Sequence, residues 1–109
     1  MPNIVIIGGG PAGLSAAIYA VRAGMQATVL YKDGGALAKT DKIENYFGFI
    51  DPVSGAELLE RGQKQAERLG AVLRQTEVTG IEYAAQGFTV KTADGVFDAD
   101  AVILATGSP

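Results

Sequence analysis

The stretch IVIIGGGPAGLSAA, residues 4–17, decides how this chain folds. It places four glycines and a proline between an apolar, β-branched run and a run rich in alanine. Short apolar runs bounded by glycine are typical of buried strands in parallel sheets. From Pro11 onward the apolar residues recur with helical spacing, and proline suits a first turn because its missing N–H would have no partner there. The stretch therefore predicts a strand over 3–7, a tight loop, and a helix over 11–23.

The glycines of this loop follow the pattern G-x-G-x-x-G at Gly8, Gly10 and Gly13. After a strand, the first glycine permits a sharp turn, the second lets a diphosphate approach bare backbone, and the third allows close packing of helix and strand. The N–H groups and the dipole at the helix start then bind negative charge. With Pro11 and Ala12, these glycines predict a dinucleotide site; the alternative is a tight strand–helix turn without a ligand.

The rest of the chain predicts an α/β fold. A second strand is expected over 26–31, and the strand–helix–strand order favours a right-handed crossover and parallel strands. The long region 32–53 has no clear period, and such loops are often functional. Ser54 and Glu57 match a capping box, which predicts a helix that ends near Leu69.

Further strands are expected in the second half of the chain. The segment 71–74 is interpreted as a core strand, and 101–105 as a last apolar strand. Between them, Asp94-Gly95 lies between alternating runs and is a hairpin signal, which predicts a three-stranded antiparallel meander over about 77–99. The expected architecture is a parallel sheet with helices on its faces and this β-meander.

Composition limits the chemistry that the chain can perform. Its 109 residues, of which 48% are apolar, suffice for one domain with a modest core. A net charge of −3 gives no electrostatic case for nucleic acid or a membrane surface, and no apolar run is long enough to span a bilayer. We see no secretory signal and expect a cytoplasmic location. Because Cys and His are absent, we assign no metal ligand and no catalytic residue.

The end of the second predicted strand departs from the usual pattern. An acid there normally binds the adenosine ribose hydroxyls, but the place falls at Tyr31, with Lys32 next. Asp33 follows and is one candidate to replace the acid; the alternative is an ordinary turn residue before Gly34.

Taken together, four segments resemble the N-terminal FAD-binding portion of the two-dinucleotide-binding-domain flavoproteins. They are the glycine loop, GGALAKTDKIENYFGF (34–49), SGAELLERGQKQAERLGA (54–71) and DADAVILATGSP (98–109). Within that group the chain is most similar to low-molecular-weight thioredoxin reductases and to thioredoxin-reductase-like ferredoxin–NADP reductases. The resemblance implies a Rossmann-like fold, FAD as cofactor, and a part in an FAD-dependent pyridine-nucleotide oxidoreductase. It also implies that residues 1–109 are one FAD-binding domain, the first segment of a normally discontinuous domain.

The resemblance further implies which residues contact FAD. Those at the diphosphate and the adenosine are Gly8, Gly10, Pro11, Ala12, Gly13, Tyr31, Lys32 and Val78. Those near the ribityl chain, the flavin and the closing turn are Gly35, Ala36, Leu37, Asn45, Ala105, Thr106 and Gly107. Ala36 stands where the family has Gln, so one side-chain hydrogen bond is lost. Tyr46 and Phe47 are expected to pack within their loop rather than stack on the flavin.

Parts of the resembled reductases have no counterpart in these 109 residues. There, an inserted domain carries the NADPH motif and a Cys-x-x-Cys pair, and a later Gly-Asp segment completes the FAD site. The chain is therefore a fragment, one half of a split flavoenzyme, or a self-standing module that binds FAD, NAD or ADP without turnover. NAD(P)H would act through a missing domain or a partner chain, and an open sheet edge favours a homodimer.

Overall fold

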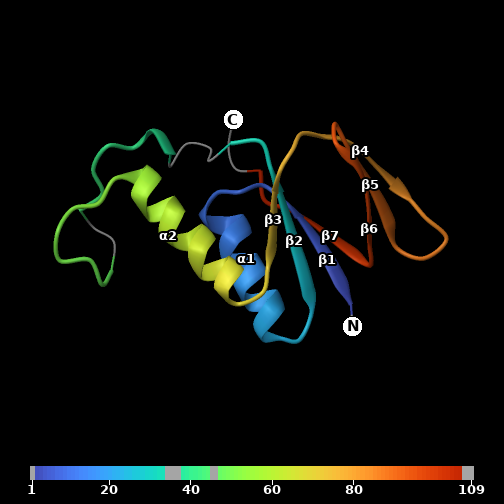
Figure 1. The fold of residues 1–109 in the computed structure, drawn as a ribbon, viewed down its shortest axis with the longest axis horizontal. Coiled ribbons are helices and arrows are strands. Elements are labelled where there is room, and N and C mark those ends of the chain that lie inside the picture. Colours follow the sequence, from blue (N-terminus) through green and yellow to red (C-terminus); the bar gives the residue numbers. More distant parts are fainter. Residues whose placement is uncertain (1, 34–37, 45–46, 107–109) are drawn as a thin grey trace.

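The fold was analysed in a computed structural model that describes residues 2–33, 38–44 and 47–106. Within these residues, a parallel sheet of four strands has the order β3-β2-β1-β7, and a separate antiparallel sheet has the order β4-β5-β6 (Figure 1). The elements are β1 (Asn3–Ile7), α1 (Pro11–Arg22), β2 (Gln26–Tyr31), α2 (Gly55–Arg68), β3 (Val72–Gln75), β4 (Val78–Tyr83), β5 (Phe88–Thr92), β6 (Gly95–Ala99) and β7 (Ala101–Leu104). The predicted parallel sheet and antiparallel meander are both confirmed.

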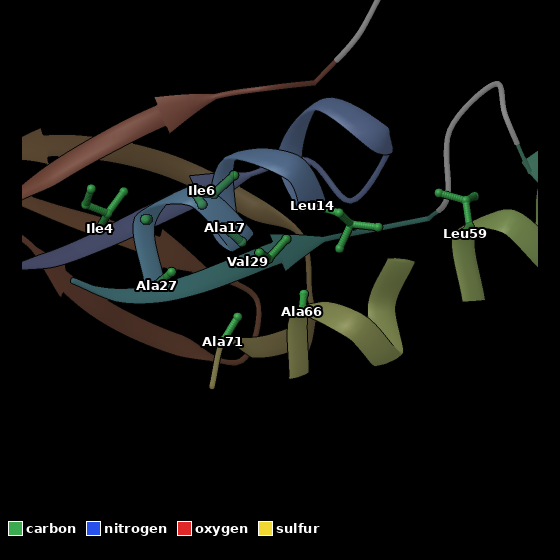
Figure 2. Packing of buried hydrophobic residues seen from close by; sticks show 10 residues of the cluster. Ile4, Ile6, Leu14, Ala17, Ala27, Val29, Leu59, Ala66 and Ala71 are labelled. Carbon is green, nitrogen blue, oxygen red and sulfur yellow. The ribbon is translucent and has the colours of Figure 1, made fainter. Parts of the chain in front are cut away.

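The parallel sheet lies between the helices and the meander (Figure 1). Because side chains alternate along a strand, β1 contributes to two cores. Ile6 packs in one cluster with Leu14 of α1 and Leu59 of α2 (Figure 2), whereas Val5 packs in the other with Val90 of the meander. Full burial of one such side chain stabilises the fold by about 1.5–3 kcal/mol. The apolar run of β1 is therefore continuous because both of its faces are covered.

The order of connections places a switch point beside β1. From β1 the chain passes through α1 to β2 and through α2 to β3, and thus moves to one side of the sheet. After the meander it returns to the opposite side of β1 as β7, again parallel. Ligands of open α/β sheets bind beyond the carboxyl ends of the strands at such a point. The glycine loop directly follows β1 at this end of the sheet.

Helix α2 begins and ends as its sequence predicts. The backbone N–H of Glu57 donates to Ser54 Oγ at 3.1 Å, which confirms the N-cap. The Glu57 carboxylate pairs with Arg61 at 3.1 Å instead of completing the capping box, and Lys64 pairs with Glu60 at 2.8 Å. The chain leaves the helix through Gly70, whose φ of +111° favours glycine.

One expectation about packing is met only in part, and another is wrong. The strand near 71–74 was expected in the core: Ala71 is buried there and Leu73 packs against it. However, β3 pairs only with β2 among the described strands, and Val72 is 45% exposed. An apolar run alone does not reveal whether a strand has one neighbour or two. Phe47 was expected to pack within its loop, but its exposure is 98%. The neighbouring Phe49 contacts α2, with the Arg61 guanidinium 5.1 Å from its ring centre. Tyr46 lies outside the described residues.

The long loop between β2 and α2 is closed by main-chain hydrogen bonds. Ile43 and Val53 exchange two of them, at 2.7 and 3.1 Å, and Gly55 N donates to Thr40 O at 2.7 Å. The closed loop projects beyond the N-terminal end of α2 (Figure 1). In the part of the chain that the structure describes, neither helix has the length and apolar character needed to cross a bilayer.

Candidate dinucleotide-binding site

Gly8 is required by the fold at the end of β1. Its N–H donates to Leu30 O at 2.9 Å, and the neighbouring Ile7 carbonyl accepts from Ala105 N at 2.8 Å. These bonds bring the ends of β1, β2 and β7 together. Gly8 has a φ of +122°, and a Cβ on it would overlap the carbonyl oxygen of Ala105. Only glycine fits both the conformation and the space.

Gly13 and Gly9 are also required by close contacts within the protein. A Cβ on Gly13 would overlap the carbonyl oxygen of Gly8, so this glycine lets α1 approach the loop. A Cβ on Gly9 would lie 2.6 Å from Tyr31 Cβ, nearer than real side chains approach. The G-x-G-x-x-G spacing did not single out Gly9, although the run of three consecutive glycines was a visible signal. The loop is thus packed against both neighbouring strands.

Gly10, unlike Gly8, has no positive φ. It is the N-cap of α1, with φ −79° and ψ −171°, a conformation open to any residue. As glycine it supplies no side-chain cap, and the first turn of α1 has no acidic residue. Pro11 and Ala12 are exposed. The positive end of α1 is therefore available to an external anion.

A second group of residues meets at the carboxyl end of β2. Thr76 N donates to Tyr31 O at 2.8 Å, which extends the pairing of β2 with β3 by one residue. Lys32 Nζ then pairs with Glu77 Oε2 at 3.0 Å, and the Lys32 carbonyl accepts from Gln75 Nε2 at 3.2 Å. The hydrogen bond and charge of Glu77, followed by the charge of Asp33, raise the pKa of Lys32 above its ordinary value. Lys32 therefore stays protonated throughout the neutral range.

The structure brings several predicted site residues to one edge of the sheet. Gly8 and Gly10 lie in the loop after β1 and Gly13 in the first turn of α1. Tyr31 ends β2 and Lys32 follows it, and Ala105 and Thr106 follow β7. Val78 follows Glu77 and begins β4, with its side chain packed against the meander-side core. Gly35, Ala36, Leu37, Asn45 and Gly107 lie outside the described residues.

A hollow of about 530 Å³ lies at the opposite end of the sheet. Asn3, Gln26 and Val72, which start three strands, line it together with Met25. We assign it no ligand, because binding in folds of this type occurs at the carboxyl ends of the strands. Among the described residues, no group of three or more acidic side chains is placed to hold a metal ion.

Fold and loop together define an α/β dinucleotide-binding protein. The chain belongs to the family of pyridine nucleotide-disulphide oxidoreductases, whose model matches residues 2–109. Members related to thioredoxin reductase are FAD-binding flavoproteins, and this chain corresponds to their N-terminal FAD-binding region. The glycine loop fits such a cofactor, because the start of α1 has no side-chain cap and no acidic residue in its first turn, so its N–H groups can bind a diphosphate.

Similar proteins share both sequence and structure with the chain. It is 43% identical to a thioredoxin reductase of Streptomyces coelicolor, over 97% of this chain and 34% of that protein. It is 42% identical to NADPH-dependent thioredoxin reductase 3 of Arabidopsis thaliana, over 97% of this chain and 21% of that protein. The atypical thioredoxin reductase TRi of Desulfovibrio vulgaris Hildenborough superposes with a TM-score of 0.90 at 46% identity, over 100% of this chain and 37% of that one. The chain thus spans about a third or less of these relatives.

Proposed function

We propose that residues 8–13 bind the diphosphate of FAD and that the chain serves as the FAD-binding part of a thioredoxin-reductase-like oxidoreductase. The observation that carries this proposal is the start of α1, where Gly10 supplies no side-chain cap and the first turn has no acidic residue. Gly8 and Gly13 are glycine because a Cβ would overlap protein backbone. Gly10 has an ordinary conformation at the start of a helix, where a Ser or Asp cap would be stabilising. A close-lying diphosphate explains why no side chain is present there.

Each predicted residue has a role in this proposal. Pro11 and Ala12 present the first turn of α1 to the diphosphate, while Tyr31, Lys32 and Val78 surround the adenosine. Ala105 and Thr106 approach the cofactor from the end of β7. The roles of Gly35, Ala36, Leu37, Asn45 and Gly107 near the ribityl chain and the flavin are supported by the sequence resemblance alone.

The flavin supplies the redox chemistry when it is bound, by accepting and passing on a hydride equivalent. The residues of this chain bind and orient it, and we assign none of them a catalytic acid or base role. Because the chain spans about a third of its bacterial relatives, NAD(P)H and the electron acceptor belong to the wider proposal. The wider proposal also includes the assignment of residues 1–109 as the first segment of a discontinuous FAD domain, a homodimer, and a cytoplasmic location.

A second candidate is an isolated module, or one half of a split flavoenzyme, that binds the adenine part of a dinucleotide without turnover. The exposure of Ile103 (37%) and Leu104 (68%) on β7 favours the split-enzyme half, because the described residues leave this strand partly uncovered. A colourless protein that binds ADP but not FAD would support the isolated module.

The experiment is a titration of the purified chain with FAD and ADP by calorimetry and flavin fluorescence. We expect FAD binding in the original protein and a loss of at least about tenfold in Gly10→Val, because the side chain would occupy the diphosphate position. Gly80→Val is the matched control, since a Cβ on Gly80 meets no atom within 4 Å. Circular dichroism checks that both variants fold. Absence of binding to every adenine dinucleotide, or equal affinity of Gly10→Val and the original, contradicts the proposal.

A further inference from the structure

We propose that Glu77 supplies the carboxylate that binds the adenosine ribose hydroxyls, in place of the acid that is missing at the end of β2. This inference rests on the proposed function. The sequence offered Asp33 as the substitute, because Asp33 lies close to the expected position in the chain. The structure instead pairs Lys32 with a carboxylate from the segment between β3 and β4.

Strand order explains how Glu77 reaches this position. β3 lies next to β2 and runs parallel to it, with Gln75 opposite Tyr31 as the last pair. Thr76 continues the ladder by donating to Tyr31 O at 2.8 Å. Glu77 therefore lies just beyond the carboxyl edge of the sheet, beside the residue that ends β2. In folds of this type the ribose lies at that edge.

The main chain around Glu77 is held by two contacts with the turn between β5 and β6. Thr76 is 8% exposed, and its hydroxyl donates to Asp94 Oδ2 at 2.6 Å. The carbonyl of Glu77 accepts from Ala93 N at 3.0 Å, so the turn between β5 and β6 holds it as well. A carboxylate on a fixed backbone loses less conformational entropy when it binds a ligand. The backbone of Glu77 is thus fixed by contacts with another part of the fold.

The charges at this position predict which adenosine is bound. Lys32 alone at the end of β2 would attract a 2′-phosphate. Its ion pair with Glu77 at 3.0 Å places a negative charge beside the ammonium group. Glu77 can accept hydrogen bonds from the 2′- and 3′-hydroxyls but repels a phosphate ester. The site therefore selects an unphosphorylated adenosine ribose, as in FAD, ADP or NAD.

The test measures the dissociation constants of ADP and 2′-phospho-ADP for the 109-residue chain. We expect the original protein to prefer ADP. Glu77→Gln should weaken ADP binding by about fivefold or more, since a neutral amide is a weaker hydrogen-bond acceptor than a carboxylate. It should also reduce the preference for ADP over 2′-phospho-ADP. The matched control is Glu82→Gln, which removes a similar exposed pair with Lys91 (2.7 Å) on the meander. Asp33→Asn tests the alternative carboxylate.

The outcomes separate the two proposals. The inference is supported if Glu77→Gln, but neither Glu82→Gln nor Asp33→Asn, shows weaker ADP binding and a smaller preference for ADP over 2′-phospho-ADP. Unchanged ADP binding in Glu77→Gln overturns it and leaves the dinucleotide site standing, as does a loss seen only in Asp33→Asn. If neither nucleotide nor FAD binds the original protein, the proposed function itself fails, and this inference fails with it. Thermal unfolding of each variant excludes a general loss of structure.

Discussion

The α-carbon of Gly8 faces the main-chain carbonyl of Ala105 with no room for a Cβ between them. Gly8 directly follows β1, and Ala105 directly follows the neighbouring strand β7. The contact therefore sets how closely the two strands approach at the switch point of the sheet, where the glycine loop begins. It links the stability of the fold to the shape of the candidate site.

Replacement of Gly8 by alanine is expected to destabilise the protein by about 2–4 kcal/mol, because unfavourable φ and steric overlap act together. Gly24→Ala is the control, since Gly24 also has a positive φ (+87°) but no atom lies within 4 Å of its Cβ position. That variant should lose only about 1 kcal/mol. Guanidinium unfolding measures both. Equal losses would show that the contact with Ala105 contributes nothing.

Gly13 in α1 and Gly62 in α2 can be compared to test whether the close packing of α1 against the glycine loop requires glycine. Gly13→Ala should cost about 1–3 kcal/mol, because its Cβ would overlap the rigid carbonyl of Gly8. In Gly62→Ala the nearest atom is the side-chain Cδ1 of Leu14 at 3.2 Å, which can move, and alanine favours the helix by up to about 1 kcal/mol. Denaturant unfolding should thus give opposite signs. A stabilised Gly13→Ala would refute the close approach.

The N-cap of α2 is expected to contribute measurably to stability. Ser54→Ala removes the acceptor of the 3.1 Å bond from Glu57 N and should cost about 1 kcal/mol, whereas Ser54→Asp should retain most of it. Ser15→Ala, at an exposed position within α1, serves as the control and should change stability little. Thermal and denaturant unfolding measure the differences. If Ser54→Ala and Ser15→Ala change the free energy of unfolding by the same amount, the N-cap of α2 does not contribute to stability.

The Glu60–Lys64 pair predicts a small dependence of stability on pH. Lys64, through its hydrogen bond and then its charge, lowers the pKa of Glu60 below the ordinary 4.5. A lowered folded-state pKa adds stability above pH 4.5 that is lost as the pH falls through the folded value. The melting temperatures of Glu60→Gln and the original should therefore differ slightly at neutral pH and converge in acid. A difference that grows below pH 4.5 would contradict this.

The first half of the fold is predictable because its signals are local. β1 and β2 have the bounds expected from their apolar runs, and α1 ends one residue before its predicted end. The Asp94-Gly95 turn likewise gave the hairpin between β5 and β6, because glycine and aspartate favour tight turns wherever they occur. The spacing of Gly8, Gly10 and Gly13 likewise predicts the tight turn between β1 and α1 at which the candidate site is proposed. Each of these features depends on residues close together in the chain.

Other features depend on contacts that the sequence does not display. Val72 lies in an apolar run, yet its strand is at an edge of the described sheet, since strand order is set by crossover connections. Gly9 was overlooked because the side chain that restricts it, Tyr31, belongs to a different strand. Glu77 was not singled out because only the pairing of β3 with β2 brings it beside Lys32.

Local sequence signals were enough to predict the strand, glycine loop and helix that begin the chain, since backbone freedom, helix capping and apolar periodicity act over a few residues. The groups that surround that loop are set by the three-dimensional packing of the strands. Ala105 against Gly8, Tyr31 against Gly9 and Glu77 beside Lys32 are contacts between strand ends far apart in the chain. Their partners are set by the order of parallel strands, which depends on how both faces of the sheet are buried.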